Sequence, residues 1–108
     1  MSYSNVIKLT TDRLKLDLIP ELGGRINKLV FNEFHIFRPF QIQNNKPGRS
    51  YKGGNFCLVP FSNRIKNSRF NFNQLEFKLA KNDPPNAIHG HAYLAKWHIL
   101  KKTSSSAV

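Results

Sequence analysis

The stretch Gly53-Gly54-Asn55-Phe56-Cys57-Leu58-Val59-Pro60-Phe61-Ser62-Asn63-Arg64-Ile65 decides how the chain is interpreted, together with His89-Gly90 downstream. Its two glycines lead into an apolar run typical of a buried strand, and Pro60 ends that run. Arg64 follows soon after. An arginine placed after an interior strand is costly unless a polar group meets it, so the stretch marks a place where a ligand could bind.

Alternation of apolar and polar residues predicts strands on both sides of this stretch. Leu14, Leu16 and Leu18, for example, fall on one face of a strand. No helical periodicity lasts for three turns, so the chain is predicted to be all-β. The expected strands cover residues 5–9, 13–19, 25–31, 34–37, 69–72, 75–79 and 96–100, with a hairpin turn at Asn73-Gln74 and a long loop over 41–54.

Length and composition indicate one small domain or part of a larger one. The chain has 108 residues, of which 40% are hydrophobic, enough for a packed core. We expect residues 1–100 to form the domain and residues 101–108, which are polar and rich in serine, to form a disordered tail. The single Cys57 excludes an internal disulfide, and no apolar stretch approaches the ~18 residues of a membrane span. The sequence therefore predicts a soluble cytoplasmic protein with no membrane partner.

The charge balance raises a second class of function. Seventeen Lys and Arg residues face six Asp and Glu residues, for a net charge of +11. Such a surplus is typical of proteins that bind nucleic acid or another polyanion. Here the basic residues are scattered singly and form no run, so a basic β-rich nucleic-acid-binding module is the weaker alternative.

Arg64 and His89 are the candidate ligand-binding residues. An arginine offers a planar fork of donors that suits vicinal hydroxyls or carboxylates, and a neutral histidine offers one donor and one acceptor. Asn63 adds an amide with both capabilities, and Trp97 could supply an apolar face for the C–H side of a ring. The plainer alternative is that Arg64 is a solvated residue after a strand and His89 a turn histidine beside Gly90.

No other group of residues indicates catalysis, a metal or a cofactor. His35 and His98 alternate with apolar residues and are predicted to lie on strand surfaces. His89 and His91 lack a matching acid or cysteine for a metal site. Cys57 lies in the apolar run and is predicted to be a small core residue. No paired carboxylates suggest general acid and base chemistry.

In order and approximate spacing, several motifs resemble those of the aldose 1-epimerase family, also called galactose mutarotases. Pro60-Phe61-Ser62-Asn63-Arg64-Ile65 is similar to the family's Pro-Phe-x-Asn-Arg-Ile signature. The other matching stretches are Ile19–Ile26, Gly53-Gly54, the phenylalanines of residues 70–79, Ile88-His89-Gly90 and Trp97.

This resemblance implies a fold, a reaction and a set of site residues. The fold would be a galactose mutarotase-like β-supersandwich of antiparallel strands, and the reaction would interconvert the α and β anomers of a hexose without a cofactor. Arg64 and His89 match residues that bind the sugar, and Asn63 flanks that site. Trp97 would lie at the pocket rim, and so would His91, which stands where the family often has a glycine.

The resemblance also implies an incomplete catalytic site. In the family a general-acid His and a general-base Glu lie in the later part of the chain, and neither motif occurs here. The matching stretches cover roughly residues 6–100, only the leading part of such an enzyme. We therefore expect a truncated chain with part of the sugar-binding site and no activity alone. A non-catalytic carbohydrate-binding relative is the alternative, and the preferred sugar, its phosphorylation and the oligomeric state stay open.

Overall fold

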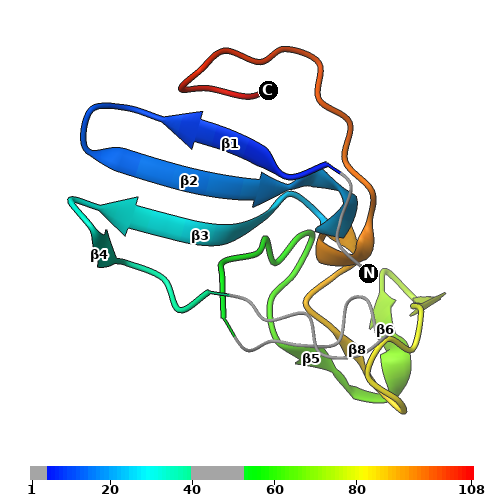
Figure 1. Cartoon of the computed structure of the whole chain (residues 1–108). Helices are drawn as coiled ribbons and strands as arrows, with labels where there is room; N and C mark the ends of the chain where they lie inside the picture. The colour runs from blue at the N-terminus through cyan, green and yellow to red at the C-terminus, as the bar shows by residue number, and fades with distance from the viewer. Residues whose placement is uncertain (1–4, 40–52) are drawn as a thin grey trace. The chain divides into compact units, whose positions relative to one another are not determined.

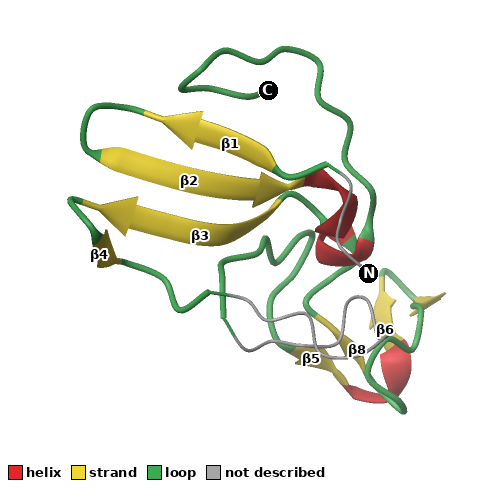
Figure 2. Cartoon of the chain, viewed as in Figure 1, coloured by secondary structure: helices red, strands yellow, loops and turns green. Residues whose placement is uncertain are grey.

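The computed structural model describes residues 5–39 and 53–108, and the chain divides into two compact units. The first unit comprises Met1–Cys57 and Tyr93–Val108, and the second comprises Leu58–Ala92. In the described residues every regular element is a short strand or a three-residue 3-10 helix (Figures 1 and 2). The all-β prediction is confirmed. Most of the predicted loop over 41–54 lies outside the described residues.

The first unit is built on an antiparallel meander. Four strands pair in chain order, with each strand hydrogen-bonded to the next (Figure 1). The strands predicted at 5–9, 13–19, 25–31 and 34–37 are all present, and no end differs from its prediction by more than two residues. They are β1 (Ile7–Thr10), β2 (Leu14–Ile19), β3 (Arg25–Phe31) and β4 (Phe34–His35).

Alternating leucines give this sheet its apolar face. Leu16 of β2 lies opposite Leu9 of β1 and Leu29 of β3, so three leucines form one row across the strands. The row is only half-buried. Two buried apolar residues of the unit cluster together, Ile19 at the end of β2 and Leu22 in the 3-10 helix η1 (Pro20–Leu22), which are 1% and 7% exposed.

Gly54 allows two backbones to meet closely beside a buried arginine. A Cβ on Gly54, whose φ is 66°, would lie 2.6 Å from the carbonyl oxygen of Ile26. This close approach accompanies the reciprocal Ile26–Asn55 hydrogen bonds of 2.9 and 2.8 Å. Arg25 is 4% exposed, donates from Nη2 to the Gly53 carbonyl at 2.6 Å, and lies over the Phe56 ring. Among residues 5–39 and 53–108 the buried arginine is therefore Arg25, which the sequence did not single out.

The prediction of a buried strand over the central apolar run is wrong. Asn55 pairs with Ile26 and Val59 with Gly90 as isolated bridges, and no strand connects them. Leu58 and Val59 are 40% and 51% exposed, and Cys57 is half-buried. The boundary between the two units falls after Cys57, so the run is divided between the units instead of crossing one core.

The end of the chain also differs from its prediction. Residues 96–100 form no strand, because the Trp97 N–H donates to the Pro20 carbonyl and the Leu100 N–H to the Val108 carbonyl. The segment predicted to be a disordered tail instead folds back as a turn, with a bridge between Lys102 and Ala107. The Ser104 carbonyl accepts a hydrogen bond of 2.8 Å from Thr10 of β1.

The second unit contains two small strand pairs. The two-residue strands β5 and β8 pair antiparallel, and β6 and β7 form the predicted hairpin. In the hairpin Phe70 lies opposite Phe77, with stacked rings whose centroids are 5.1 Å apart. The elements are β5 (Arg64–Ile65), η2 (Lys66–Ser68), β6 (Arg69–Phe72), β7 (Leu75–Lys78) and β8 (Ala87–Ile88).

The β6–β7 turn predicts a stabilising substitution. Asn73 and Gln74 have φ angles of 47° and 64°, as a type I′ turn requires, and glycine is favoured over glutamine at the second position. We expect Gln74→Gly to stabilise the hairpin by about 0.5–1 kcal/mol. Hydrogen exchange of the β6 and β7 amides should slow about twofold to fivefold. Gln74→Ala, which keeps the Cβ, should show no slowing, and equal slowing in both variants would contradict the turn assignment.

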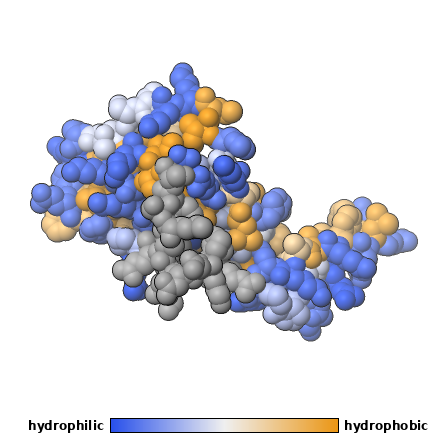
Figure 3. Space-filling view, turned by 45° about the vertical axis from the view of Figure 1, so that its right-hand side comes forward, coloured by the Kyte–Doolittle hydropathy of each residue, from blue (hydrophilic) through white to orange (hydrophobic). Residues whose placement is uncertain are grey.

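Apolar side chains reach the surface in both units, where Figure 3 shows them as orange areas among hydrophilic ones. Phe34 of the first unit is 75% exposed, and Phe72 and Leu75 of the second are 63% and 62% exposed. In residues 5–39 and 53–108 no helix is long or apolar enough to cross a membrane.

Candidate functional site

The pairing of β5 with β8 brings two of the candidate residues to neighbouring strand ends. Arg64 lies opposite Ile88 in the register, and His89 directly follows Ile88. Ala87 and Ile88 are 2% and 3% exposed, so β8 is firmly held. The Arg64 side chain is 55% exposed, so this arginine is not the buried charge that the apolar run suggested.

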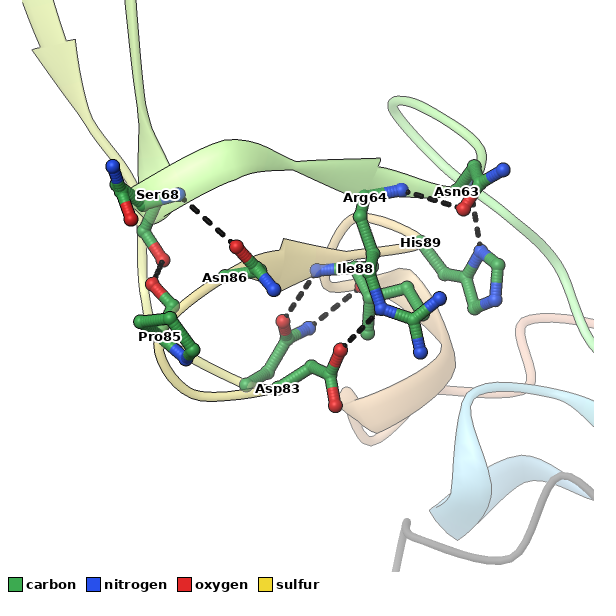
Figure 4. A network of polar contacts seen from close by, with 10 residues as sticks. Asn63, Arg64, Ser68, Asp83, Pro85, Asn86, Ile88 and His89 are labelled. Atoms are coloured by element: carbon green, nitrogen blue, oxygen red, sulfur yellow. Dashed lines mark hydrogen bonds and ion pairs between the residues drawn. The ribbon is translucent and has the colours of Figure 1, made fainter.

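Asn63 and His89 hold each other through two hydrogen bonds. The Asn63 N–H donates to Nδ1 of the His89 ring at 2.9 Å, and the His89 N–H donates to the Asn63 carbonyl at 3.0 Å (Figure 4). Both residues have positive φ, 63° and 59°, and the Asn63 side chain accepts a hydrogen bond from the Arg64 N–H at 2.9 Å. Asparagine tolerates this left-handed conformation well because its short side chain bonds locally.

The bond from Asn63 fixes the tautomer of the His89 ring. Because Nδ1 accepts a hydrogen, the proton of the neutral imidazole lies on Nε2, which becomes a donor. We expect long-range ¹H–¹⁵N correlation spectra at neutral pH to show the Nε2–H pattern for His89. The exposed His35 should show a mixture of tautomers under the same conditions. An Nδ1–H pattern for His89 would contradict the hydrogen bond.

Asp83 meets Arg64 from the loop before β8. Its Oδ2 lies 2.6 Å from Nε of Arg64, and the two side chains are 34% and 55% exposed. Figure 4 shows the carboxylate at the Nε edge of the guanidinium. The two Nη groups of Arg64 make no hydrogen bond within the part of the chain that the structure describes. The arginine can therefore offer those donors to a ligand while Asp83 holds its other edge.

Asn82 fastens the backbone on both sides of His89. Its Oδ1 accepts from the Ile88 N–H at 2.7 Å, and its Nδ2 donates to the carbonyls of Ile88 and Gly90 at 2.8 and 2.9 Å. One half-buried amide thus holds three backbone groups around the histidine. The position of His89 depends on this amide as much as on strand pairing.

The remaining predicted site residues lie in different surroundings. His91 is exposed in the second unit, and its N–H donates to the Val59 carbonyl at 3.0 Å. Trp97 belongs to the first unit, where its ring covers Gly24 and is 42% exposed. The structure thus brings Asn63, Arg64 and His89 together within one unit, and the rim roles of His91 and Trp97 stay predictions. Among the described residues no three His, Cys, Asp or Glu side chains cluster as metal ligands would.

Asn82 and Asp83 are the residues that the sequence did not assign to the site. Both lie in Asn82-Asp83-Pro84-Pro85-Asn86, where the two prolines by themselves indicate only a stiff loop that leads to His89. A polar pair immediately before two prolines, close upstream of a candidate histidine, is the signal that could have found them. Asp83 has no second carboxylate beside it in the sequence, so the pattern typical of general acid and base chemistry does not reveal it.

Comparison with known proteins places these motifs in a family. The family model described as Aldose 1-epimerase matches residues 5–108. The chain is 29% identical over 103 residues to the Uncharacterized protein YphB of Escherichia coli (strain K12). That match covers 94% of this chain and 34% of the relative.

Solved structures show the same fold. The chain is similar to a candidate aldose 1-epimerase from Escherichia coli K12, with a TM-score of 0.81 and 27% identity over 95% of this chain and 34% of that one. A galactose mutarotase-like protein from Clostridium acetobutylicum gives a TM-score of 0.68 and 21% identity over 99% and 35% of the two chains. The prediction of a galactose mutarotase-like, all-β fold is confirmed, and the chain spans about one third of the length of these proteins. With its family match over residues 5–108, the chain belongs to the aldose 1-epimerase family.

Proposed function

We propose that Asn63, Arg64 and His89 form the sugar-binding part of a hexose mutarotase site. The observation that carries the proposal is the β5–β8 register, which sets Arg64 beside the strand end where His89 begins. The Nη groups of Arg64 would donate to vicinal hydroxyls, and Nε2–H of His89 to the ring oxygen or a hydroxyl. Asn63 holds the imidazole in the orientation that this contact requires.

Binding is the part of the reaction that these residues can supply. Mutarotation opens and recloses the hexose ring, which needs a base to take the anomeric proton and an acid to protonate the ring oxygen. The resemblance places those two residues in the later part of family chains, beyond residue 108. We therefore propose that residues 1–108 alone bind a hexose without interconverting its anomers, inside the cytoplasm.

Two measurements on the 108-residue chain test this proposal. Polarimetry with α-D-glucose and α-D-galactose should show mutarotation no faster than in buffer. NMR titration with the same sugars should shift signals of residues 63–64 and 88–90 at millimolar concentrations, the weak range expected of an incomplete site. Clear catalysis would contradict the absence of the acid and base, and shifts elsewhere alone would contradict the site.

Variants separate the site from the rest of the surface. Arg64→Ala should weaken sugar binding at least fivefold, because it removes the Nη donors. Arg69→Ala is the matched control, since its side chain is 59% exposed and also faces a carboxylate, that of Glu76 at 3.7 Å. The control should bind sugar like the unmodified chain. The polyanion alternative would be favoured if the two variants weakened sugar binding equally. It would also be favoured if the chain bound single-stranded oligonucleotide with a steep salt dependence.

A further inference from the structure

Asp83 fixes the direction in which Arg64 offers its donors. The carboxylate contacts the guanidinium at Nε alone, 2.6 Å away. A guanidinium is rigid and planar, so a bond at Nε also sets where the two Nη groups point. Without that bond the arginine side chain would sample many rotamers, and a ligand would bear the entropy cost of ordering it.

The carboxylate itself comes from a loop that is tied down at several points. Asp83 and Asn86 exchange backbone hydrogen bonds of 3.1 and 2.8 Å across Pro84-Pro85. The Ser68 hydroxyl donates to the Pro85 carbonyl at 3.0 Å, and the Asn86 side chain accepts from the Asn67 N–H at 3.1 Å (Figure 4). Exposed ion pairs usually contribute little because both side chains must be ordered, and here the loop has already ordered one of them.

The same contact offsets part of the positive charge of Arg64. A guanidinium paired with a carboxylate can still donate to neutral hydroxyls, whereas a ligand carboxylate or phosphate beside it would also meet the negative charge of Asp83. The chain as a whole has a net charge of +11, which attracts anions without selecting them. Asp83 therefore disfavours an anionic ligand at the site, whereas the net charge attracts anions to the chain as a whole.

We propose that Asp83 is a positioning residue that aims the Nη donors of Arg64 and makes the site select neutral sugars over anionic ones. The proposal rests on the sugar site proposed above. It assigns to Asp83 a role that operates through Arg64, without direct contact with the ligand.

The test compares two ligands that differ by one charge at the same ring stereochemistry. Dissociation constants for D-galactose and D-galacturonate, and for D-glucose and D-glucuronate, are measured by NMR titration at 150 mM salt, which suppresses long-range attraction. The unmodified chain should bind the neutral member of each pair more tightly. Asp83→Asn should weaken binding of the neutral sugar and change the neutral-to-anionic ratio about threefold to tenfold in favour of the acid.

Matched variants exclude a general effect of charge or folding. Glu76→Gln removes a carboxylate that faces a different arginine of the same unit and should leave the ratio unchanged. Asp83→Glu keeps the charge and should retain most of the preference. The Nε–H signal of Arg64 should exchange slowly with water in the unmodified chain and rapidly in Asp83→Asn, a readout that needs no ligand.

The outcomes separate this proposal from the one on which it rests. If the unmodified chain binds sugar at residues 63–64 and 88–90 but Asp83→Asn leaves the ratio and the Arg64 Nε–H signal unchanged, the role of Asp83 is overturned and the sugar site stands. If no sugar binds to the unmodified chain, the sugar site fails and the selectivity proposed for Asp83 fails with it.

Discussion

Gly90→Ala is expected to unfold the second unit or to destabilise it by at least about 3 kcal/mol, because the added methyl group meets backbone that cannot move. A Cβ on Gly90 would overlap the carbonyl of Val59, and the φ of 68° is itself unfavourable for alanine. The same Val59 carbonyl accepts hydrogen bonds from His91 and Ala92 at 3.0 and 3.2 Å. Moving it away from the methyl group would break both bonds.

The measurement is hydrogen exchange of the β5–β8 amides, with thermal unfolding alongside. Gly24→Ala is the matched control, because Gly24 has a similar φ of 64° but faces the side chain of Trp97, at 3.0 Å from the added Cβ. Trp97 is 42% exposed and can shift, so this variant should lose only about 1–2 kcal/mol in its own unit. If the β5–β8 amides of Gly90→Ala exchange as slowly as those of the unmodified chain, the Val59 carbonyl does not lie as close to Gly90 as described.

Asn82→Asp is expected to cost about 2–4 kcal/mol although it changes the shape of the side chain very little. The carboxylate can still accept from the Ile88 N–H. Its second oxygen, however, replaces an NH₂ group that donates to the carbonyls of Ile88 and Gly90. Two hydrogen bonds then become repulsive oxygen–oxygen contacts beside Ile88, which is only 3% exposed.

Chemical denaturation with ¹H–¹⁵N spectra checks this result, because the signals of residues 87–90 should broaden or shift. Asn67→Asp introduces the same charge on an exposed side chain that makes no hydrogen bond to the described residues, and should stay within about 0.5 kcal/mol of the unmodified chain. If the two variants prove equally stable, Asn82 does not fasten His89.

The strands that the sequence predicted correctly are those in which apolar and polar residues alternate. Leu14, Leu16 and Leu18 alternate with polar residues, and the pairing of β1, β2 and β3 follows from that pattern. The β6–β7 hairpin was predicted from its flanking alternation in spite of a poor turn residue, Gln74. Cross-strand stacking of Phe70 on Phe77 contributes about 0.5–1.5 kcal/mol, comparable to the cost of that residue.

The two strand predictions that failed have different causes. An uninterrupted apolar run has no alternation to specify a register, so Phe56–Val59 could be taken for one buried strand when its residues belong to two units. The segment 96–100 alternates, but its N–H groups bond to Pro20 and Val108 and join no strand ladder. Hydrogen-bond partners so distant in sequence cannot be read from local pattern.

For the site, the sequence could predict the candidate binding residues but not the residues that hold them in place. The spacing of Asn63, Arg64 and His89 within known motifs was enough to nominate them. The role of Asp83 depends on a loop that returns 19 residues after Arg64, and that of Asn82 on an amide that reaches six to eight residues ahead. Such contacts arise only when the loop closes in three dimensions.

The ring of His89 accepts the backbone N–H of Asn63, so this side chain supports the turn at residue 63. An alanine at 89 deletes any contact with the ligand and also removes the acceptor for a backbone N–H 26 residues away, so alanine scanning there would overstate the direct contribution of the imidazole. Recruiting this site to a new ligand calls for paired mutagenesis, with a short acceptor such as asparagine at 89 tested against each residue at 63 that accepts a left-handed backbone.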